Sequence, residues 1–220
     1  MEGLIIPPTE NSTMAKKKKA RPTKRHARTT TRKAPARKKR QALKKVAATA
    51  TGAAGAGGGR EVKDAVALLR WTHDFLNKLT ADFPPEKMTA QACPTDNHVM
   101  WTLGHLATTY VWIASLLDGK VMPLPESYQT LFGYKSKPTS DAGAYPPAAE
   151  VRRNCDAAFA RLLEAAGALK EADAHKPVLG ESYGFASDRL DAIYKTIWHE
   201  GWHQGQISCM RRALGMPSVM

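Results

Sequence analysis

The sequence predicts an all-α fold, a four-helix bundle, on three observations. Between Arg60 and Met220, four segments of 20 to 27 residues repeat apolar side chains at helical spacing. Proline and glycine residues separate these segments, and no run alternates apolar and polar residues with period two, so strands are not supported. Short loops after the first and third segments favour antiparallel neighbours, whereas a 26-residue crossover lets the second and third run parallel. We therefore expect an up-down-down-up bundle.

The first two helices are predicted from their apolar stripes and from the residues that flank them. The first is expected from about Glu61 to Ala81, because Pro84-Pro85 follows and cannot continue a helix. The second is expected to start at Pro94-Thr95-Asp96, where Asp can cap a helix, and to end at Gly119.

The crossover and the last two helices follow from the same signals. Lys120 to Tyr145 is rich in Pro, Gly and Ser and is predicted as a long connection with one short turn around Ser127 to Phe132. A third helix is expected to start at Pro146-Pro147. The fourth is expected from about Asp188 to Leu214, before Gly215 and Pro217.

Charge divides the chain into two parts. Residues 1–60 hold 17 of the 33 Lys and Arg but only two acids, Glu2 and Glu10, and so carry a net charge of +15, whereas the rest carries −2. Residues 16–45 have almost no large apolar side chain, so they are predicted to be disordered, and the Ala/Thr/Gly run 46–59 is predicted as a flexible linker. We therefore predict a tail and linker at 1–59 and one bundle domain at 60–220.

Two readings of this basic tail stay open. A flexible arm with so many cations can bind nucleic acid without sequence preference through residues 16–45, or it can be a solvated polycation with no dedicated partner. Met14, followed by Ala and four Lys, is an alternative translation start to Met1.

Other segments bear on the compartment. The small-residue run 46–59 lacks Leu, Ile and Phe, so it is a poor secretory signal, and no stretch approaches 18 consecutive apolar residues, so no membrane span is expected. Cys93, Cys155 and Cys209 form no ligand spacing and cannot all pair within one chain. We expect reduced thiols in a cytoplasmic protein, one associated with the nucleoid if the tail binds DNA.

The segment Trp198 to Gln206 carries the clearest functional signal. His199 and His203 are four residues apart on a predicted helix, so both imidazoles can reach one metal ion from an inward face. His105 lies on the inward face of the second helix and is the candidate third ligand. Gly104 beside it, and Gly201 and Gly205 on the fourth helix, are expected to let a neighbouring backbone approach closely. Three imidazoles that leave a position open are typical of a catalytic metal site.

Other interpretations of these histidines have to be weighed. A lone histidine on an apolar face is more often a hydrogen-bonded core residue, and His98 and His73 are further inward-facing candidates for a ligand. Residues 199–203 also fit the HExxH pattern of zinc peptidases. Those enzymes take their third ligand downstream, and residues 204–220 contain no His, Asp or Glu, so this reading is not favoured.

Together the motifs resemble a known family. A Gly-His-Leu at residues 104–106 and a His-Glu-x-x-His-x-Gly-Gln-like run from His199 to Gln206, within about 150 residues of helix, resemble the DinB-like superfamily of metal-dependent hydrolases and thiol transferases. The resemblance covers about residues 62–214. It implies an up-down-down-up bundle, often dimeric, with the metal bound by His105, His199 and His203. It also implies a small-molecule substrate, for some members a low-molecular-weight thiol.

The expected chemistry has two branches. A divalent ion held by three imidazoles can make hydroxide available for hydrolysis, or it can hold a thiol as thiolate for transfer. Zinc is the first choice of ion, with nickel or iron(II) as alternatives. Glu200 is a candidate orienting residue or base and Gln206 a candidate for hydrogen bonding to water or substrate, while Trp101, Trp112 and Trp202 are expected to shape an apolar pocket.

A hypothesis of another class is a nucleic-acid-associated protein. In that case the tail binds DNA or RNA, and the bundle is a non-catalytic interaction or dimerisation module.

Overall fold

The computed structural model describes residues 60–219, and within them it contains helices and no strand. The long helices are α2 (Glu61–Thr80), α3 (Val99–Asp118), α5 (Ala148–Ala168) and α6 (Arg189–Ala213). A short α4 (Ser127–Phe132) lies in the crossover, and the connections contain single 3-10 turns, η1 (Pro85–Lys87), η2 (Ala142–Ala144) and η3 (Glu171–Asp173). The all-α expectation is confirmed, and the predicted turn around Ser127 to Phe132 is a real helix.

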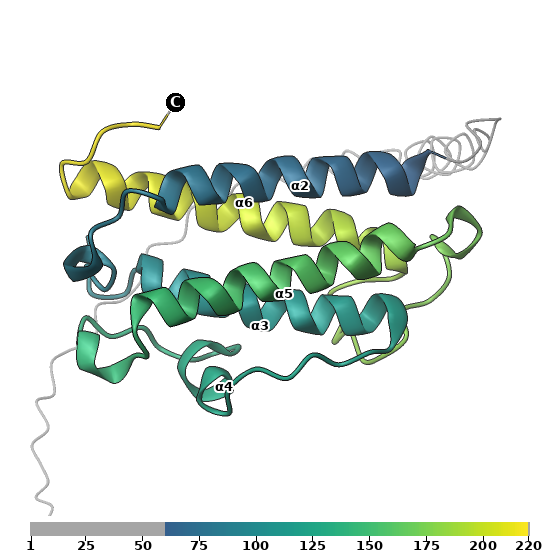
Figure 1. The fold of residues 1–220 in the computed structure, drawn as a ribbon, viewed down its shortest axis with the longest axis horizontal. Helices are drawn as coiled ribbons and strands as arrows, with labels where there is room; N and C mark the ends of the chain where they lie inside the picture. The colour runs from purple at the N-terminus through teal and green to yellow at the C-terminus, as the bar shows by residue number, and fades with distance from the viewer. Residues whose placement is uncertain (1–59, 220) are drawn as a thin grey trace, which may run out of the picture. The chain divides into compact units, whose positions relative to one another are not determined.

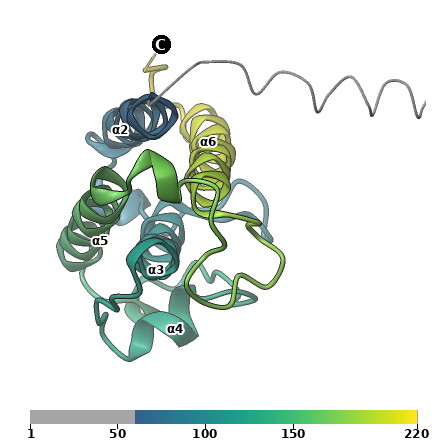
Figure 2. The same ribbon diagram turned by 90° about the vertical axis from the view of Figure 1, so that its right-hand side faces the viewer.

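The long helices pack in two pairs. α3 packs most extensively against α5, and α2 against α6, with α4 resting on α3. α2 and α6 run in one direction and α3 and α5 in the other (Figure 1), and the end-on view shows all four around one core (Figure 2). That core is apolar, and its fully buried side chains include Leu69, Leu103, Tyr110, Leu162 and Ile193. Because α6 touches both α2 and α3, its residues can meet partners from two different helices.

Helix α3 begins at Val99, so the start predicted at Pro94-Thr95-Asp96 is wrong. The carboxylate of Asp96 accepts a hydrogen bond from the backbone N–H of Cys93, and the Asp96 N–H donates to the Cys93 carbonyl, which closes a turn ahead of the helix. The cap is His98, whose Nδ1 accepts from the N–H of Trp101 at 3.0 Å. A histidine in this role is uncommon, so preferences for capping residues pointed to the wrong position.

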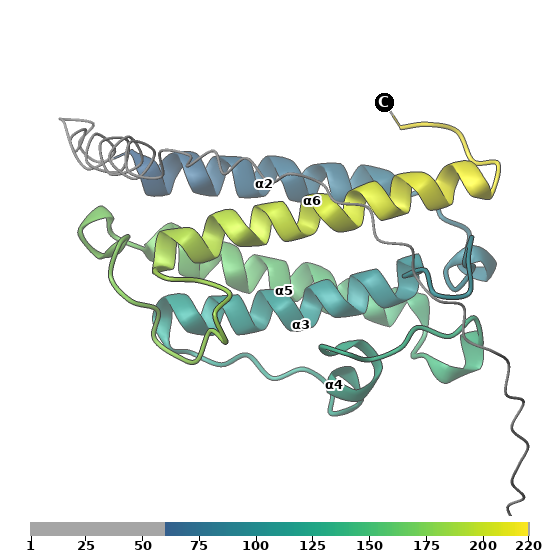
Figure 3. The same cartoon turned by 180° about the vertical axis from the view of Figure 1, so that it is seen from behind.

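The segment before α6 folds back over the end of α3, as the view from behind shows (Figure 3). The N–H of Leu179 donates to the Leu116 carbonyl, and the indole of Trp112 donates to the carbonyl of Glu181. These bonds hold the loop that carries Phe185, which packs against Trp112.

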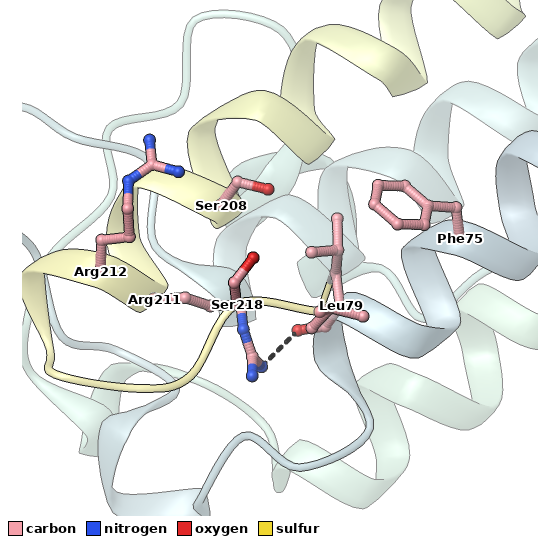
Figure 4. Close-up of a pocket in the computed structure, with 7 residues that line it drawn as sticks. Phe75, Leu79, Ser208, Arg211, Arg212 and Ser218 are labelled. Atoms are coloured by element: carbon pink, nitrogen blue, oxygen red, sulfur yellow. Dashed lines mark hydrogen bonds between the residues drawn. The ribbon is translucent and has the colours of Figure 1, made fainter.

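The far end of α6 is tied to α2 by a buried arginine. Arg211 is 2% exposed and donates to the Leu79 carbonyl at 2.9 Å, the contact drawn in Figure 4. The same guanidinium bonds both oxygens of Asp82 and the carbonyl of Pro217. Charge-assisted bonds of this kind fix the end of α2, the end of α6 and the residues after it in one arrangement.

No described helix is both long and apolar enough to cross a lipid bilayer. The predicted disordered tail, the linker, the nucleic-acid contact through residues 16–45 and the choice between the two starts concern residues 1–59, outside the described part of the chain.

Candidate metal centre

Three histidines converge between α3 and α6. The Nε2 atom of His199 lies 3.3 Å from Nε2 of His105 and 3.1 Å from Nε2 of His203. One ring nitrogen from each histidine falls in a group within 4.8 Å, an arrangement that could hold a metal ion. These are the three residues that the sequence singled out, and the spacing of four along α6 delivers two of them from one helical face.

The spacing of the nitrogens suits a divalent ion. Zinc–imidazole bonds of about 2.0–2.1 Å in tetrahedral geometry place neighbouring nitrogens about 3.3–3.4 Å apart. The His105–His199 separation of 3.3 Å equals this spacing, and the His199–His203 separation of 3.1 Å is slightly shorter.

Hydrogen bonds at the other ring nitrogens decide which atoms face the centre. His105 Nδ1 lies 2.9 Å from the carbonyl oxygen of Phe132, and His203 Nδ1 lies 2.9 Å from the amide oxygen of Gln206. Both oxygens can only accept, so each Nδ1 carries the proton, and the Nε2 of each neutral ring presents a lone pair. A proton on His199 Nε2 could properly satisfy only one of these two lone pairs, whereas a cation would satisfy both.

Burial keeps the rings neutral. Loss of hydration, together with a smaller effect of the neighbouring histidines, lowers the pKa of His203 to about 3 and that of His199 to about 4. Burial also lowers the pKa of His105, against a smaller opposing effect of its bond to the Phe132 carbonyl. At neutral pH all three therefore offer lone pairs without first losing a proton.

The position of His105 depends on a glycine. A Cβ on Gly104 would lie 2.3 Å from Cγ of Phe132, so only glycine lets this ring sit against α3. That contact brings the Phe132 carbonyl to His105 Nδ1. Trp101 stacks on the His105 ring with centroids 4.5 Å apart, and its indole N–H donates to Ser136. A close approach at Gly104 was predicted and is present, but the group that approaches is the Phe132 ring and not a neighbouring backbone.

The same prediction is wrong for Gly201 and Gly205. Apart from the neighbouring backbone of α6, no atom of the described residues lies within 4 Å of a Cβ built on either glycine, and both are exposed. They lie on the side of α6 that faces away from its neighbours, so no second helix of the described chain requires them.

Neither of the other two candidate histidines joins the centre. His98 is fully buried as the cap of α3, and its Nε2 lies 2.9 Å from the Thr139 carbonyl. His73 stacks on Phe159 with centroids 3.5 Å apart. Both are core histidines with structural partners.

Glu200 faces α2 and not the three histidines. It is fully buried, with Oε1 3.4 Å from His73 Nδ1 and 3.3 Å from the amide nitrogen of Gln204, while Oε2 has no hydrogen-bond partner among residues 60–219. The Gln204 amide also donates to the Thr72 carbonyl at 2.7 Å. A general base must reach the proton that it removes, so this position does not favour that role for Glu200.

Gln206 reaches the centre through His203. Its amide oxygen accepts from His203 Nδ1, and the amide of Asn97 donates to the same oxygen at 3.4 Å. Gln206 therefore holds the proton of His203 on the outer nitrogen and links that ligand to the residues before α3.

The aromatic residues predicted around the site have different positions. Trp101 is buried against His105, Trp112 packs on Phe185, and Trp202 is 59% exposed. Phe185 lies edge-on to His199 with centroids 6.5 Å apart. Phe132, Phe185 and Asn97 were not singled out from the sequence, because all three lie outside the long helices and carry no motif.

Comparison with protein families gives one match. The sequence model of the DinB superfamily matches residues 68–207, which include His105, His199 and His203. A search of curated proteins gives no match to the chain.

Proposed function

Since the chain belongs to the DinB superfamily, we propose that its helical domain is a divalent-metal-dependent enzyme with His105, His199 and His203 as the protein ligands. The observation that carries this proposal is the pair of lone pairs at His105 Nε2 and His203 Nε2, both turned toward His199 Nε2 by bonds at their outer nitrogens. Without a cation, a proton on His199 Nε2 can pair with only one of these lone pairs, and the other is left without a donor in a poorly hydrated site.

The fold belongs to the same proposal. We assign the four long helices to an up-down-down-up bundle in which the crossover between α3 and α5 lets these two run parallel, in agreement with the helix directions in Figure 1. In this arrangement the two ligands from α6 face the single ligand from α3, and α2 and α5 complete the core.

A divalent ion held by three imidazoles acts as a Lewis acid and can activate either a water for hydrolysis or a thiol for transfer. The protein supplies the rest. The Phe132 carbonyl and Gln206 hold the ligand rings in one tautomer, Trp101 fixes the His105 ring by stacking, and Phe185 restricts access to His199. His203 is 6% exposed, so the accessible side of the centre is that of His105 and His199, which are half-buried.

Glu200 and Gln206 then act through other residues. Gln206 orients His203, and Glu200 joins α6 to α2 through His73 and Gln204 just beside His199. Zinc is the ion we propose first, because its bond lengths match the nitrogen separations, with nickel and iron(II) as alternatives that imidazole ligands also suit.

Elemental analysis of purified protein tests the metal. Wild type is expected to hold about one divalent ion per chain, and His203→Ala is expected to lose it while keeping its helical circular dichroism. His175→Ala is the matched control, because His175 is an exposed histidine whose contacts are with Glu61 and Asp188 and not with the three candidate ligands. A wild type without metal, or a His203→Ala variant that keeps it, would refute the proposal.

A second assay distinguishes hydrolysis from thiol transfer. With the metal-loaded full chain, ester or amide cleavage in the absence of any thiol supports a hydrolase. Loss of free thiol only when both a thiol and an electrophile such as 1-chloro-2,4-dinitrobenzene are present supports a transferase. Each activity must disappear in His203→Ala to be assigned to this centre.

Homodimerisation is part of the proposal because the outer faces of α2 and α6 expose large apolar side chains. Trp71 of α2 is 68% exposed and Trp198 of α6 is 59% exposed. Light scattering of wild type beside Trp71→Lys tests whether a second copy covers Trp71. A wild type that is monomeric at high concentration would exclude it.

The sequence itself supports a second function. The net charge of +15 in residues 1–60 suits a nucleic-acid-binding arm attached to the bundle. DNA retention should fall steeply as salt is raised and should vanish when residues 1–59 are deleted. Retention unchanged by the deletion would show that the arm is not the binding element. If the bundle also proves to be free of metal, it is better read as an interaction module.

A further inference from the structure

A cavity of about 390 Å³ lies between the residues before α3 and the second half of α6. That volume is in the range of small-molecule sites. The residues that define its chemistry are Asp96, Asn97, Trp202, Gly205, Gln206 and Met210. None of them is among the three histidines.

The cavity is connected to the metal centre through one side chain. Gln206 lines the cavity, and its amide oxygen accepts from both His203 Nδ1 and the Asn97 amide. Trp202 and Gln206 flank His203 on α6, so the cavity begins within one turn of a metal ligand. A molecule held here would touch the group that orients His203.

The lining favours a positively charged group beside Asp96. Among the described residues, Asp96 is the only charged one that lines the cavity. Its Oδ2 accepts from the Cys93 N–H, and within residues 60–219 nothing else bonds the side chain, so Oδ1 is free for a ligand. Trp202, 59% exposed, adds an indole face, the aromatic surface that attracts cations most strongly.

The rest of the cavity suits the flat apolar part of a ligand. Gly205 has no side chain to fill the space beside it, where no described atom lies within 4 Å of the position of a Cβ, and Met210 contributes a buried apolar side chain to the lining. Cys209 also lines the cavity, and its sulfur lies 3.2 Å from the Arg212 guanidinium. The carboxylate of Asp96 is therefore the favoured position for an ammonium group.

We propose that this cavity is a ligand site beside the metal centre, on the Gln206 side of His203, and that it takes an organic ammonium ion with a flat apolar body. Its place beside a metal rests on the function proposed above, whereas its selectivity for ammonium compounds depends only on the lining. The ammonium group pairs with Asp96 and the face of Trp202, and the apolar body lies over Gly205 against Met210.

Two probes with the same ring and opposite charge test the selectivity. 2-Phenylethylamine and 3-phenylpropionate are titrated into the full chain and followed by ligand-observed NMR, with and without a chelator. The amine is expected to bind in both conditions, about tenfold more weakly to Asp96→Asn, in which the new amide oxygen still accepts from the Cys93 N–H. Gly205→Leu fills the cavity and is expected to abolish binding, while its exposed helical position keeps the fold intact.

Two results would contradict the binding of ammonium compounds in this cavity. Amine binding that Gly205→Leu leaves unchanged, in a variant with wild-type circular dichroism and melting temperature, places the amine elsewhere. Tighter binding of the propionate, lost in Gly205→Leu, assigns the cavity to anions. Because the chelated protein is included, neither result depends on the metal.

Proximity to the centre is measured separately. In protein loaded with cobalt(II), the resonances of bound 2-phenylethylamine are expected to broaden relative to the zinc-loaded protein, and this difference should vanish in Gly205→Leu. Equal line widths in cobalt and zinc protein, with cobalt uptake verified by elemental analysis, would refute the place of the ligand beside the metal centre. Failure of cobalt uptake would instead refute the metal centre, so the two failures are distinguishable.

Discussion

Gly104→Ala is the substitution whose effect can be worked out most directly from the structure. The added Cβ would lie 2.3 to 2.5 Å from three ring atoms of Phe132, whereas carbon atoms in contact prefer about 3.5–4.0 Å. The ring must therefore move by more than about 1 Å. It is fully buried and packs on Tyr128 and Tyr145, so it has no open space to move into. Overpacking of this kind costs about 1–3 kcal/mol of folding free energy.

The displacement should also reach the metal centre. The Phe132 carbonyl, which shares a residue with the displaced ring, accepts the 2.9 Å bond from His105 Nδ1. Once this bond is lengthened, His105 can turn or change tautomer, and its Nε2 no longer reliably offers a lone pair. Loss of such an orienting bond typically weakens metal binding about 10- to 100-fold.

Metal affinity is measured by competition with a chelating indicator, and stability by thermal melting of the metal-free protein. At about 2–4 °C per kcal/mol for a domain of this size, the melting temperature should fall by roughly 2–12 °C. Gly201→Ala is the matched control, because no atom lies within 4 Å of the new methyl group and alanine favours an exposed helix. If Gly104→Ala binds metal as tightly as Gly201→Ala, the Phe132 carbonyl does not position His105.

The remaining predictions concern the bond to His203, acid stability and the clamp at the end of α6. Gln206→Ala should weaken metal binding about 10- to 100-fold, and Gln206→Glu should restore most of it because a carboxylate also accepts from His203 Nδ1; equal affinities for all three proteins in the indicator assay would contradict this. In metal-free protein the unfolded histidines bind protons below about pH 6.5, but folded His199 binds one only near pH 4 and His203 near pH 3. The unfolded state therefore holds more protons, so the free energy of unfolding should fall as pH is lowered from about 6.5 to about 4, and replacement of both histidines by Gln should flatten this dependence in urea titrations. Arg211→Met should cost about 2–3 kcal/mol, since it leaves the Leu79 carbonyl without its charged donor, and a melting temperature within 1 °C or so of wild type would count against the clamp.

The fold class was predictable because each long helix repeats its buried residues at helical spacing. Leu69, Leu76 and Leu79 of α2 are buried as that pattern requires. Helix ends were predictable where a common signal marks them, such as Asp188, which caps α6 by accepting from the Asp191 N–H. The start of α3 was missed because its cap is a histidine, and Asp96 had the stronger capping preference but is used in a preceding turn.

The candidate ligands were predictable for a similar reason. His199 and His203 are brought together by local helix geometry alone, whatever the rest of the chain does. His105 required a tertiary assumption, that α3 faces α6, and its neighbour Gly104 gave a hint of close packing. Gly201 and Gly205 of α6 led to the same prediction, but no neighbour packs against them. A glycine in a sequence does not reveal whether its side without a Cβ faces a neighbouring element or solvent.

The residues that support the ligands could not be predicted because they contribute backbone or depend on long-range packing. Phe132 acts through its carbonyl, which every residue has, and reaches His105 across 27 positions of sequence. Asn97 meets Gln206 across 109 positions. Neither contact produces a periodic pattern in the sequence, so both become visible only in the three-dimensional structure.

These contacts indicate that the crossover and the segment before α3 do more than connect helices, because both help to position the candidate ligands. The three candidate ligands come from two helices, but contacts from outside both helices support two of them: α4 supplies the carbonyl for His105, and Asn97 bonds the Gln206 amide that holds His203. Within residues 60–219, only His199 lacks such support, because its Nδ1 is buried without a hydrogen-bond partner. An ion bound at the three Nε2 atoms would fix that ring as well, so metal binding should be coupled to the packing of α4 and of residues 92–97 against the bundle. A substitution in either connection, far from the ligands in sequence, should therefore weaken metal binding before it unfolds the helices.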